Sequence, residues 1–346
     1  MTPRTSQPVI GHGRVALIPL LLGLLVLASI VSVAVGAVVL PLPRVLRALL
    51  QPRAVGVQAT DATIVWDIRL GRVLLAALIG AGLAVSGTAL QGLFRNPLAD
   101  PFVIGASSGA ALGATLAIVS GFGPVSLAAF VGALLAVTAA YSIAEIGGVV
   151  PATALLLAGA ALNTFLSAIV ALVMLFNEQS TYAVLNWLLG GLSGRSWSQL
   201  SASLPYMAIG LSVLWLLARP LDALAFGDET AQSLGLPLGR ARGVIVAAAS
   251  LTTAAAVAAG GTIGFVGLIA PHVARLLVGA EHARLIPASA LIGALLLLVA
   301  DDVARTALAP LELPAGVLTA ALGGPFFLYL LKTRQSDFGA DRKSVV

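Results

Sequence analysis

Apolar runs long enough to cross a membrane follow one another along almost the whole chain. Of 346 residues, 59% are hydrophobic and only 10% are charged, and the mean hydropathy is +1.04. A water-soluble domain does not have that composition, so a polytopic membrane protein with one integral domain over residues 1–346 is predicted. Cysteine is absent, which excludes disulfides, thiolate metal sites and cysteine nucleophiles.

A helix needs roughly 20 residues to cross the hydrocarbon core of a bilayer. By that measure the sequence predicts an all-α fold with about ten transmembrane helices, and an even number of spans places both termini on one side. The predicted spans lie near residues 15–40, 72–92, 103–121, 124–146, 152–176, 203–218, 243–260, 261–279, 285–307 and 314–332.

The distribution of Lys and Arg sets the predicted orientation. With the N-terminus inside, twelve of these residues fall in cytoplasmic segments and seven arginines lie outside. Both termini are therefore expected in the cytoplasm, with the protein in a bacterial inner membrane. Five outside arginines stand between the first two spans, which indicates a partner on that side: Arg44, Arg47, Arg53, Arg69 and Arg72. The cations are spread over loop ends without interleaved aromatics, so nucleic-acid binding is not expected.

One polar segment, GDETAQSLGLPLGRARG at residues 227–243, separates two strongly apolar regions. Asp228 suits the cap of a short helix with Glu229 in its first turn, Gly235 suits its end, and Pro237 suits the start of a second short helix. This 227–243 segment is predicted to be a rigid protrusion on the cytoplasmic face, suited to docking into a soluble partner. An ordinary ordered loop is the alternative from composition alone.

Four long stretches carry a resemblance to a known family. They begin with IRLGRVLLAALIGAGLAVSGTALQGLFRNPLADPFVIGASSGAALGA at 68–114 and continue with the 227–243 segment, 259–305 and 312–331. Together they resemble the FecCD family, the permease subunits of ABC importers for haem, ferric siderophores and cobalamin. The resemblance implies a type II importer with two permease copies, two ATPase subunits that bind ATP and Mg²⁺, and a periplasmic binding protein. A homodimer is expected because the chain holds one permease unit.

The resemblance also implies roles for individual residues. The 227–243 segment matches the coupling helices that enter a groove on each ATPase subunit. The residues concerned are Gly227, Asp228, Glu229, Ala231, Leu234, Gly235, Leu236 and Pro237. Arg69, Arg72 and Arg305 match periplasmic arginines that meet carboxylates of the binding protein. For Arg305, a local pair with Asp301 one helical turn earlier is an equal alternative.

The predicted roles of other polar residues and turns are less specific. Arg195, in the periplasmic connection 177–200, is expected to meet an anionic ligand or to anchor at the interface beside Trp187 and Trp197. The inner gate is expected near residues 147–153, and FRNPLADP at 94–101 is expected to be a structural cytoplasmic turn. His282 is expected to face solvent or a partner, and the three histidines have no metal-ligand spacing.

The sequence separates three classes of function. It has no G-x-x-x-x-G-K-[ST] loop, so ATP hydrolysis is expected on a separate polypeptide. An ion-coupled secondary transporter would need buried ionisable groups, and the acids near the spans, Glu145, Asp301 and Asp302, lie close to helix ends. An intramembrane enzyme would need catalytic residues, and none is evident. The favoured function is the import of haem with no cofactor bound by this chain, with ferric siderophore or cobalamin as alternatives.

Overall fold

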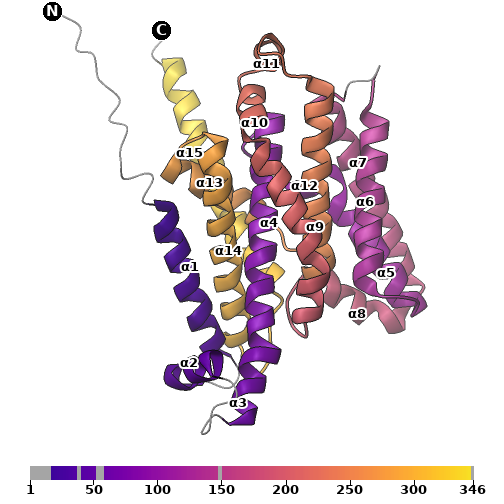
Figure 1. The fold of residues 1–346 in the computed structure, drawn as a ribbon. Coiled ribbons are helices and arrows are strands. Elements are labelled where there is room, and N and C mark those ends of the chain that lie inside the picture. Colours follow the sequence, from indigo (N-terminus) through magenta and orange to yellow (C-terminus); the bar gives the residue numbers. More distant parts are fainter. Residues whose placement is uncertain (1–16, 37–39, 52–57, 147–149, 344–346) are drawn as a thin grey trace, which may run out of the picture.

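The computed structural model describes residues 17–36, 40–51, 58–146 and 150–343, and helices dominate it (Figure 1). Within these residues, seven helical segments are long and apolar enough to cross a membrane, and three shorter apolar helices accompany them. The chain is therefore an all-α polytopic membrane protein, as predicted, and each predicted span contains a helix. The long segments are α1 (Leu17–Ala34), the run Ala59–Phe94, α6 (Val125–Ala144), α7 (Ala152–Leu175), α9 (Trp197–Leu216), α12 (Leu238–Gly260) and α14 (His282–Thr306). The shorter ones are α5 (Ala106–Ser120), α13 (Val266–Val278) and the Ala315–Tyr329 part of α15 (Ala315–Lys343).

Some boundaries differ from the prediction. The first helix ends at Ala34 and not near residue 40. The second begins much earlier than residue 72, because α3 (Ala59–Thr63), the wider π-helical turns of η2 (Ile64–Leu70) and α4 (Gly71–Phe94) follow one another without a break.

The predicted eighth span is shorter than a full crossing. α13 has 13 residues, about 20 Å of helix against a hydrocarbon core of about 30 Å. Gly261 and Phe265 have φ angles of +74° and +67°, so the chain cannot continue from α12 into α13 as one helix. An irregular stretch connects the two helices in place of the predicted helical residues 261–265.

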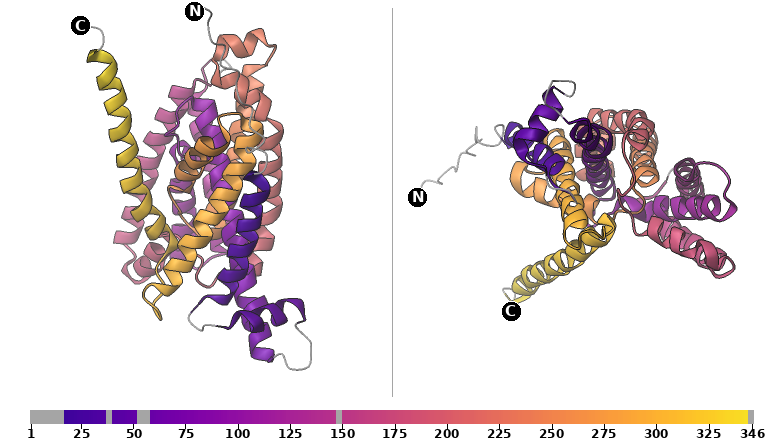
Figure 2. Two further views of the ribbon diagram at one scale, coloured as in Figure 1. Left: turned by 90° about the vertical axis from the view of Figure 1, so that its left-hand side faces the viewer. Right: turned by 90° about the horizontal axis from the view of Figure 1, so that it is seen from below.

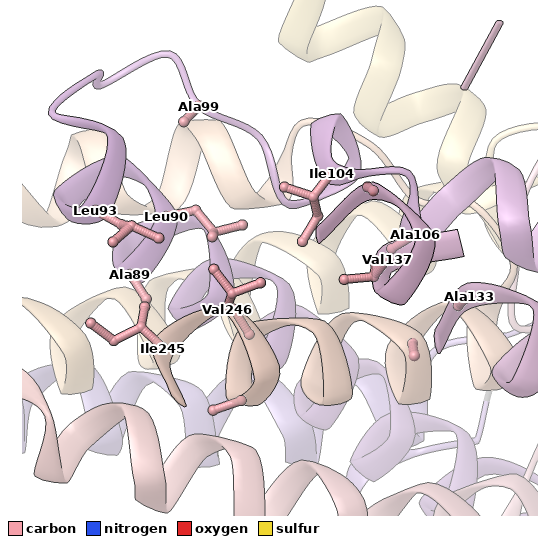
Figure 3. Packing of buried hydrophobic residues seen from close by; sticks show 14 of the residues in the cluster. Ala89, Leu90, Leu93, Ala99, Ile104, Ala106, Ala133, Val137, Ile245 and Val246 are labelled. Atoms are coloured by element: carbon pink, nitrogen blue, oxygen red, sulfur yellow. The ribbon is translucent and has the colours of Figure 1, made fainter. Parts of the chain in front are cut away.

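Two helices form the centre of the bundle. In both the Ala59–Phe94 run and α12, 78% of the most apolar window is buried inside the protein. Ala89 and Leu90 of α4 lie beside Ile245 and Val246 of α12 (Figure 3). Small residues permit this close packing, since van der Waals contact and not the hydrophobic effect holds helices together in lipid.

The short helices gather at the two ends of the bundle. α10 (Ala218–Ala225) and α11 (Asp228–Ser233) lie at one end, which we call the α11 end (Figure 1). α2 (Leu42–Leu50) and α8 (Glu178–Leu188) lie at the other, the α8 end. α15 projects from one flank of the bundle (Figure 2), and only 17% of the most apolar window of α7 is buried.

Candidate coupling and docking sites

The 227–243 segment forms a tip at the α11 end. α9 is followed by α10, then by α11, and α12 begins at Leu238. Gly227 and Gly235 flank α11 with φ angles of +114° and +79°, a backbone region that glycine enters without a steric penalty. The predicted end of the short helix at Gly235 is thus confirmed.

Two details of the predicted pattern are wrong. Gly227 stands at the cap position and Asp228 is already the first helical residue. Pro237 does not begin a second short helix, because it caps the long α12, and the companion of α11 is α10 on its other side. The Asp228 carboxylate does not cap α11 because it is held elsewhere.

Asp228 ties the tip to the body of the bundle. Its two carboxylate oxygens accept hydrogen bonds from Arg242 Nη2 on α12, each 2.7 Å long. Arg95 Nη2, just beyond the end of α4, lies 3.5 Å from Asp228 Oδ1. The Arg242 side chain is only 9% exposed, and hydrogen bonds between charged groups are stronger than neutral ones. The tip is therefore tied to α12 through Arg242 and approaches the residue that follows α4. Sequence reasoning missed both contacts.

The outer surface of the tip is partly apolar. Leu234 is 70% exposed and Phe226, immediately before Gly227, is 79% exposed. Glu229 is also exposed, whereas Ala231 is fully buried and Leu236 is partly buried. Sequence reasoning assigned no role to Phe226. Its position, as a large apolar residue directly before a polar loop, could have indicated a contact surface.

A second polar link joins α10 to α14. His282 Nδ1 lies 2.6 Å from Asp222 Oδ1, and the His282 backbone N–H donates to the same oxygen over 3.0 Å. The prediction that His282 faces solvent or a partner is wrong, because the residue is only 4% exposed. Gly92 of α4 lies against the ring, and a Cβ there would be 2.6 Å from His282 Nε2.

A network of buried charges occupies the α8 end. Arg72 donates from Nε and Nη2 to the two carboxylate oxygens of Asp301 over 2.9 and 3.0 Å, and from Nη1 to Glu312 Oε2 over 3.0 Å. Arg305 Nε lies 3.9 Å from Asp301 Oδ2, and Arg305 Nη2 contacts Asp302. The local pairing considered for Arg305 is thus present in the structure.

The same network holds the end of α1. Arg305 Nη2 donates to the Ser32 carbonyl over 2.8 Å. Arg69 Nη1 donates to the carbonyls of Val33 and Ala34 over 2.9 and 3.0 Å. The structure therefore brings Arg69, Arg72 and Arg305 together, but as buried residues that join α1, the start of α4 and the end of α14. Their contact with a binding protein stays a prediction.

Glu312 is the most exposed acid of this network. Its side chain is 34% exposed and lies in the connection between α14 and α15. Partial burial favours the protonated carboxyl, but the charge of Arg72 and the hydrogen bonds from Arg72 and Ser193 outweigh that effect and hold the pKa of Glu312 below its ordinary value.

Arg195 has a structural role that the sequence did not predict. Its Nη1 donates to the carbonyls of Ala258 and Ala259, the last turn of α12. A cation at a helix C-terminus satisfies free carbonyls and interacts favourably with the helix dipole. Burial lowers the pKa of Arg195 to about 10, so the guanidinium remains charged at neutral pH. Contact with an anionic ligand at this position stays a prediction.

The turn after α4 is locally stabilised, as expected for a structural turn. Asp100 Oδ1 accepts a hydrogen bond from the Phe102 backbone N–H over 2.8 Å and caps the short helix η3 (Pro101–Ile104). Burial raises the pKa of Asp100 to about 6. Of the predicted inner gate, residues 147–149 lie outside the described residues, and Ala152 begins α7.

Comparison with known proteins identifies the family. The sequence profile of the FecCD transport family matches residues 24–333. The chain belongs to the FecCD transport family. The cobalamin import system permease protein BtuC of Halobacterium salinarum is 45% identical over 86% of this chain and 80% of its own length. The hemin transport system permease protein HmuU of Yersinia pestis is 44% identical over 80% of this chain and 85% of its own.

A third relative and one solved structure agree with this assignment, and a second solved structure shares the fold alone. The Fe(3+)-citrate import system permease protein YfmE of Bacillus subtilis is 40% identical over 89% of this chain and 92% of its own. A structure assigned to the metal-chelate type of ABC transporter, in an inward-facing conformation, matches with a TM-score of 0.81 and 32% identity over 92% of this chain and 99% of that chain. PsaBC from Streptococcus pneumoniae, at 19% identity and a TM-score of 0.52, shares the fold over 75% of this chain and 90% of its own. This FecCD family member is an ABC importer permease and a multi-pass membrane protein.

Proposed function

We propose that this permease imports a metal chelate, with haem as the expected cargo, by alternating access powered by a separate ATPase. The observation that carries the proposal is the tip at the α11 end. Phe226 and Leu234 project from it as exposed apolar side chains, while Asp228 ties it to α12 and approaches the residue that follows α4. A rigid tip transmits rigid-body movement of a docked subunit to the membrane helices, which a floppy loop could not do.

The proposed assembly contains two copies of this chain, two ATPase subunits and one binding protein. The ATPases dock at the α11 end, which we place in the cytoplasm together with both termini, in a bacterial inner membrane. The binding protein docks at the α8 end, where Glu312 leaves part of the arginine network within reach of solvent. The second copy is placed on the side of α7, which carries exposed apolar side chains such as Leu157 at 72% and Phe165 at 61%.

The proposal names one cargo from three candidates. Haem is favoured because the sequence of residues 89–114 resembles that of haem permeases, and a hemin permease is among the relatives. Cobalamin is the second candidate, because a cobalamin permease matches at 45% identity. A ferric chelate is the third candidate, since a permease named for Fe(3+)-citrate also matches.

The structure gives little support to an ion-coupled secondary transporter. Such a mechanism needs an ionisable group in the membrane that can take up and release the coupling ion. Asp301 is 1% exposed and already engaged by Arg72 and Arg305. Asp302 is likewise paired with Arg305.

The direct test is uptake into proteoliposomes that contain this chain, its cognate ATPase and its binding protein. Haem, cobalamin and ferric citrate are offered in parallel, with and without ATP inside. We expect ATP-dependent accumulation of haem and none driven by a proton or sodium gradient alone. ATP-dependent accumulation of cobalamin instead would keep the importer function and overturn the cargo, whereas gradient-driven uptake would overturn the mechanism.

The coupling role of the tip is tested by the double variant E229K/L234K. We expect loss of ATPase association, measured by co-purification, with a folded permease. The matched control is Q179K/Y182K on α8, which places two lysines on exposed positions at the other end. Full association and transport by E229K/L234K would remove the coupling assignment.

A further inference from the structure

α2 lies across the α8 end beside the end of α1 (Figure 1). Its side chains form three distinct faces. One face, with Val45 and Ala48, is fully buried against the protein. Trp66 holds the helix in place, because its Nε1 donates to the Ala48 carbonyl over 2.9 Å. Nine residues of helix are therefore anchored to the bundle on one side only.

The second face of α2 is an exposed row of leucines. Leu42 is 47% exposed, Leu46 is 38% exposed and Leu50 is 79% exposed. Residues four apart lie on one side of a helix, so these three side chains form a continuous apolar stripe. In water such a stripe would be unfavourable, because apolar surface that stays exposed forgoes the favourable free energy of burial.

The third face of α2 is cationic. Arg44 and Arg47 are exposed, and neither forms an ion pair with a residue of the described part of the chain. Helical spacing places Arg47 beside Leu50, and Arg44 between Arg47 and the buried Ala48, so the cationic face borders the leucine row on one side and the buried face on the other. Apolar and basic faces side by side are the pattern of a helix that lies in a membrane interface.

The depth of α2 in the bundle agrees with that pattern. Trp66 and Trp197 are 36% and 39% exposed, and they lie near the α8 end of two membrane-spanning segments. Trp197 Nε1 donates to the Trp66 carbonyl over 2.6 Å. Tryptophan is enriched at the level of lipid headgroups, so the contact between Trp66 and Ala48 places α2 at that level.

We propose that α2 is a membrane-surface helix that binds anionic phospholipids. Leu42, Leu46 and Leu50 enter the acyl region of the adjoining leaflet, and Arg44 and Arg47 bind the headgroup phosphates. A docking face for a protein partner would explain the arginines, but it would leave an exposed leucine row at the depth of the headgroups. This inference does not depend on the cargo or on the coupling role of the tip.

Depth is measured first, and the lack of native cysteine makes labelling direct. Nitroxide labels are placed singly at L46C and R44C in liposomes of phosphatidylglycerol and phosphatidylcholine. We expect the label at position 46 to collide mainly with dissolved oxygen, which concentrates in lipid, and the label at 44 to collide more with a water-soluble nickel chelate. Equal exposure of both labels to the nickel chelate would overturn the proposal.

Lipid selectivity is measured second, by native mass spectrometry of lipids retained from mixed nanodiscs. We expect R44Q/R47Q to reduce the enrichment of phosphatidylglycerol by roughly threefold to tenfold, and R44K/R47K, the matched control, to keep it. Unchanged enrichment in R44Q/R47Q would contradict the proposal. A loss of binding-protein affinity in that variant without a change in lipid would reassign the face to protein docking.

Discussion

At the residue scale, Asp228 connects the candidate coupling tip to the membrane helices. The variant D228N keeps the shape of the side chain but removes its charge, and it leaves the largely buried Arg242 without an anionic partner. We expect a loss of about 1–2 kcal/mol in the free energy of unfolding. We also expect more ATP hydrolysed per molecule transported, since a loosened tip transmits less movement. Thermal unfolding in detergent and the ratio of hydrolysis to uptake measure the two effects.

The control for D228N is E229Q, which removes the same charge from the neighbouring exposed residue. E229Q should leave the unfolding temperature unchanged, because exposed charges contribute little to stability. A charge exchange, D228R/R242D, should recover part of the lost coupling. Equal unfolding temperatures for D228N and E229Q would show that the ion pair is not what holds the tip.

Asp100 gives a prediction about pH. Its folded-state pKa is raised from 3.8 to about 6 by burial. Its contribution to stability is therefore fully present below its unfolded pKa and is lost as the pH rises through about 6. D100N retains the oxygen that accepts from Phe102 N–H but cannot ionise. We expect D100N to be more stable than the parent by up to about 3 kcal/mol at about pH 8, and no such advantage at about pH 4. An advantage independent of pH would contradict the assignment.

Some of these residue contacts could not be predicted from one sequence. Arg72 and Asp301 are 229 positions apart, and only the packing of α4 on α14 makes them neighbours. The pair of Asp301 and Arg305 could be predicted from the sequence, because the two residues are four apart on one helix. The charges of the 227–243 segment were visible, but the partner of Asp228 depended on how the turn at Gly235 folds back toward α12.

At the scale of elements, close backbone contact between α4 and α14 dictates where side chains are forbidden. A Cβ added at Gly293 would lie 2.4 Å from the Gly80 carbonyl oxygen and 2.5 Å from Ala84 Cβ. G293A should therefore separate the helices and cost about 1–3 kcal/mol. The control is G324A on α15, where a Cβ meets no heavy atom within 4 Å. If thermal unfolding shows equal stability for the two variants, the contact is not as tight as the structure indicates.

Hydropathy predicted which segments become membrane helices, because length and apolar composition are local properties. It did not predict the short α13, since the break depends on the positive φ at Phe265. That conformation is unusual for a bulky residue and depends on tertiary packing. Nor did it predict α10 as the partner of α11, since the run Ala218–Ala225 has only eight residues and is too short to register as a membrane span. Elements set by tertiary contacts therefore needed the structure.

At the scale of the whole molecule, α7 has a large apolar face that no other described part of the chain covers. Lipid would cover that face equally well, so exposure alone does not decide between lipid and a second copy. Single cysteines at Leu157 or Phe165 separate the two, because a disulfide between copies requires α7 to meet α7 across the proposed dimer. We expect oxidation in membranes to give a covalent dimer from either variant.

The matched control is I209C on α9, which is 56% exposed and belongs to a helix that stands apart from α7 (Figure 1). It should remain monomeric under the same oxidation, because α9 lies outside the proposed interface. Random collisions in the bilayer would affect both sites equally, so they cannot produce a dimer from the α7 variants alone. A dimer from I209C with none from L157C or F165C would place the interface on α9. The absence of a covalent dimer from all three variants, in membranes that support ATP-dependent uptake, would show that two copies do not meet through α7. The cargo pathway would then have to lie elsewhere in the assembly.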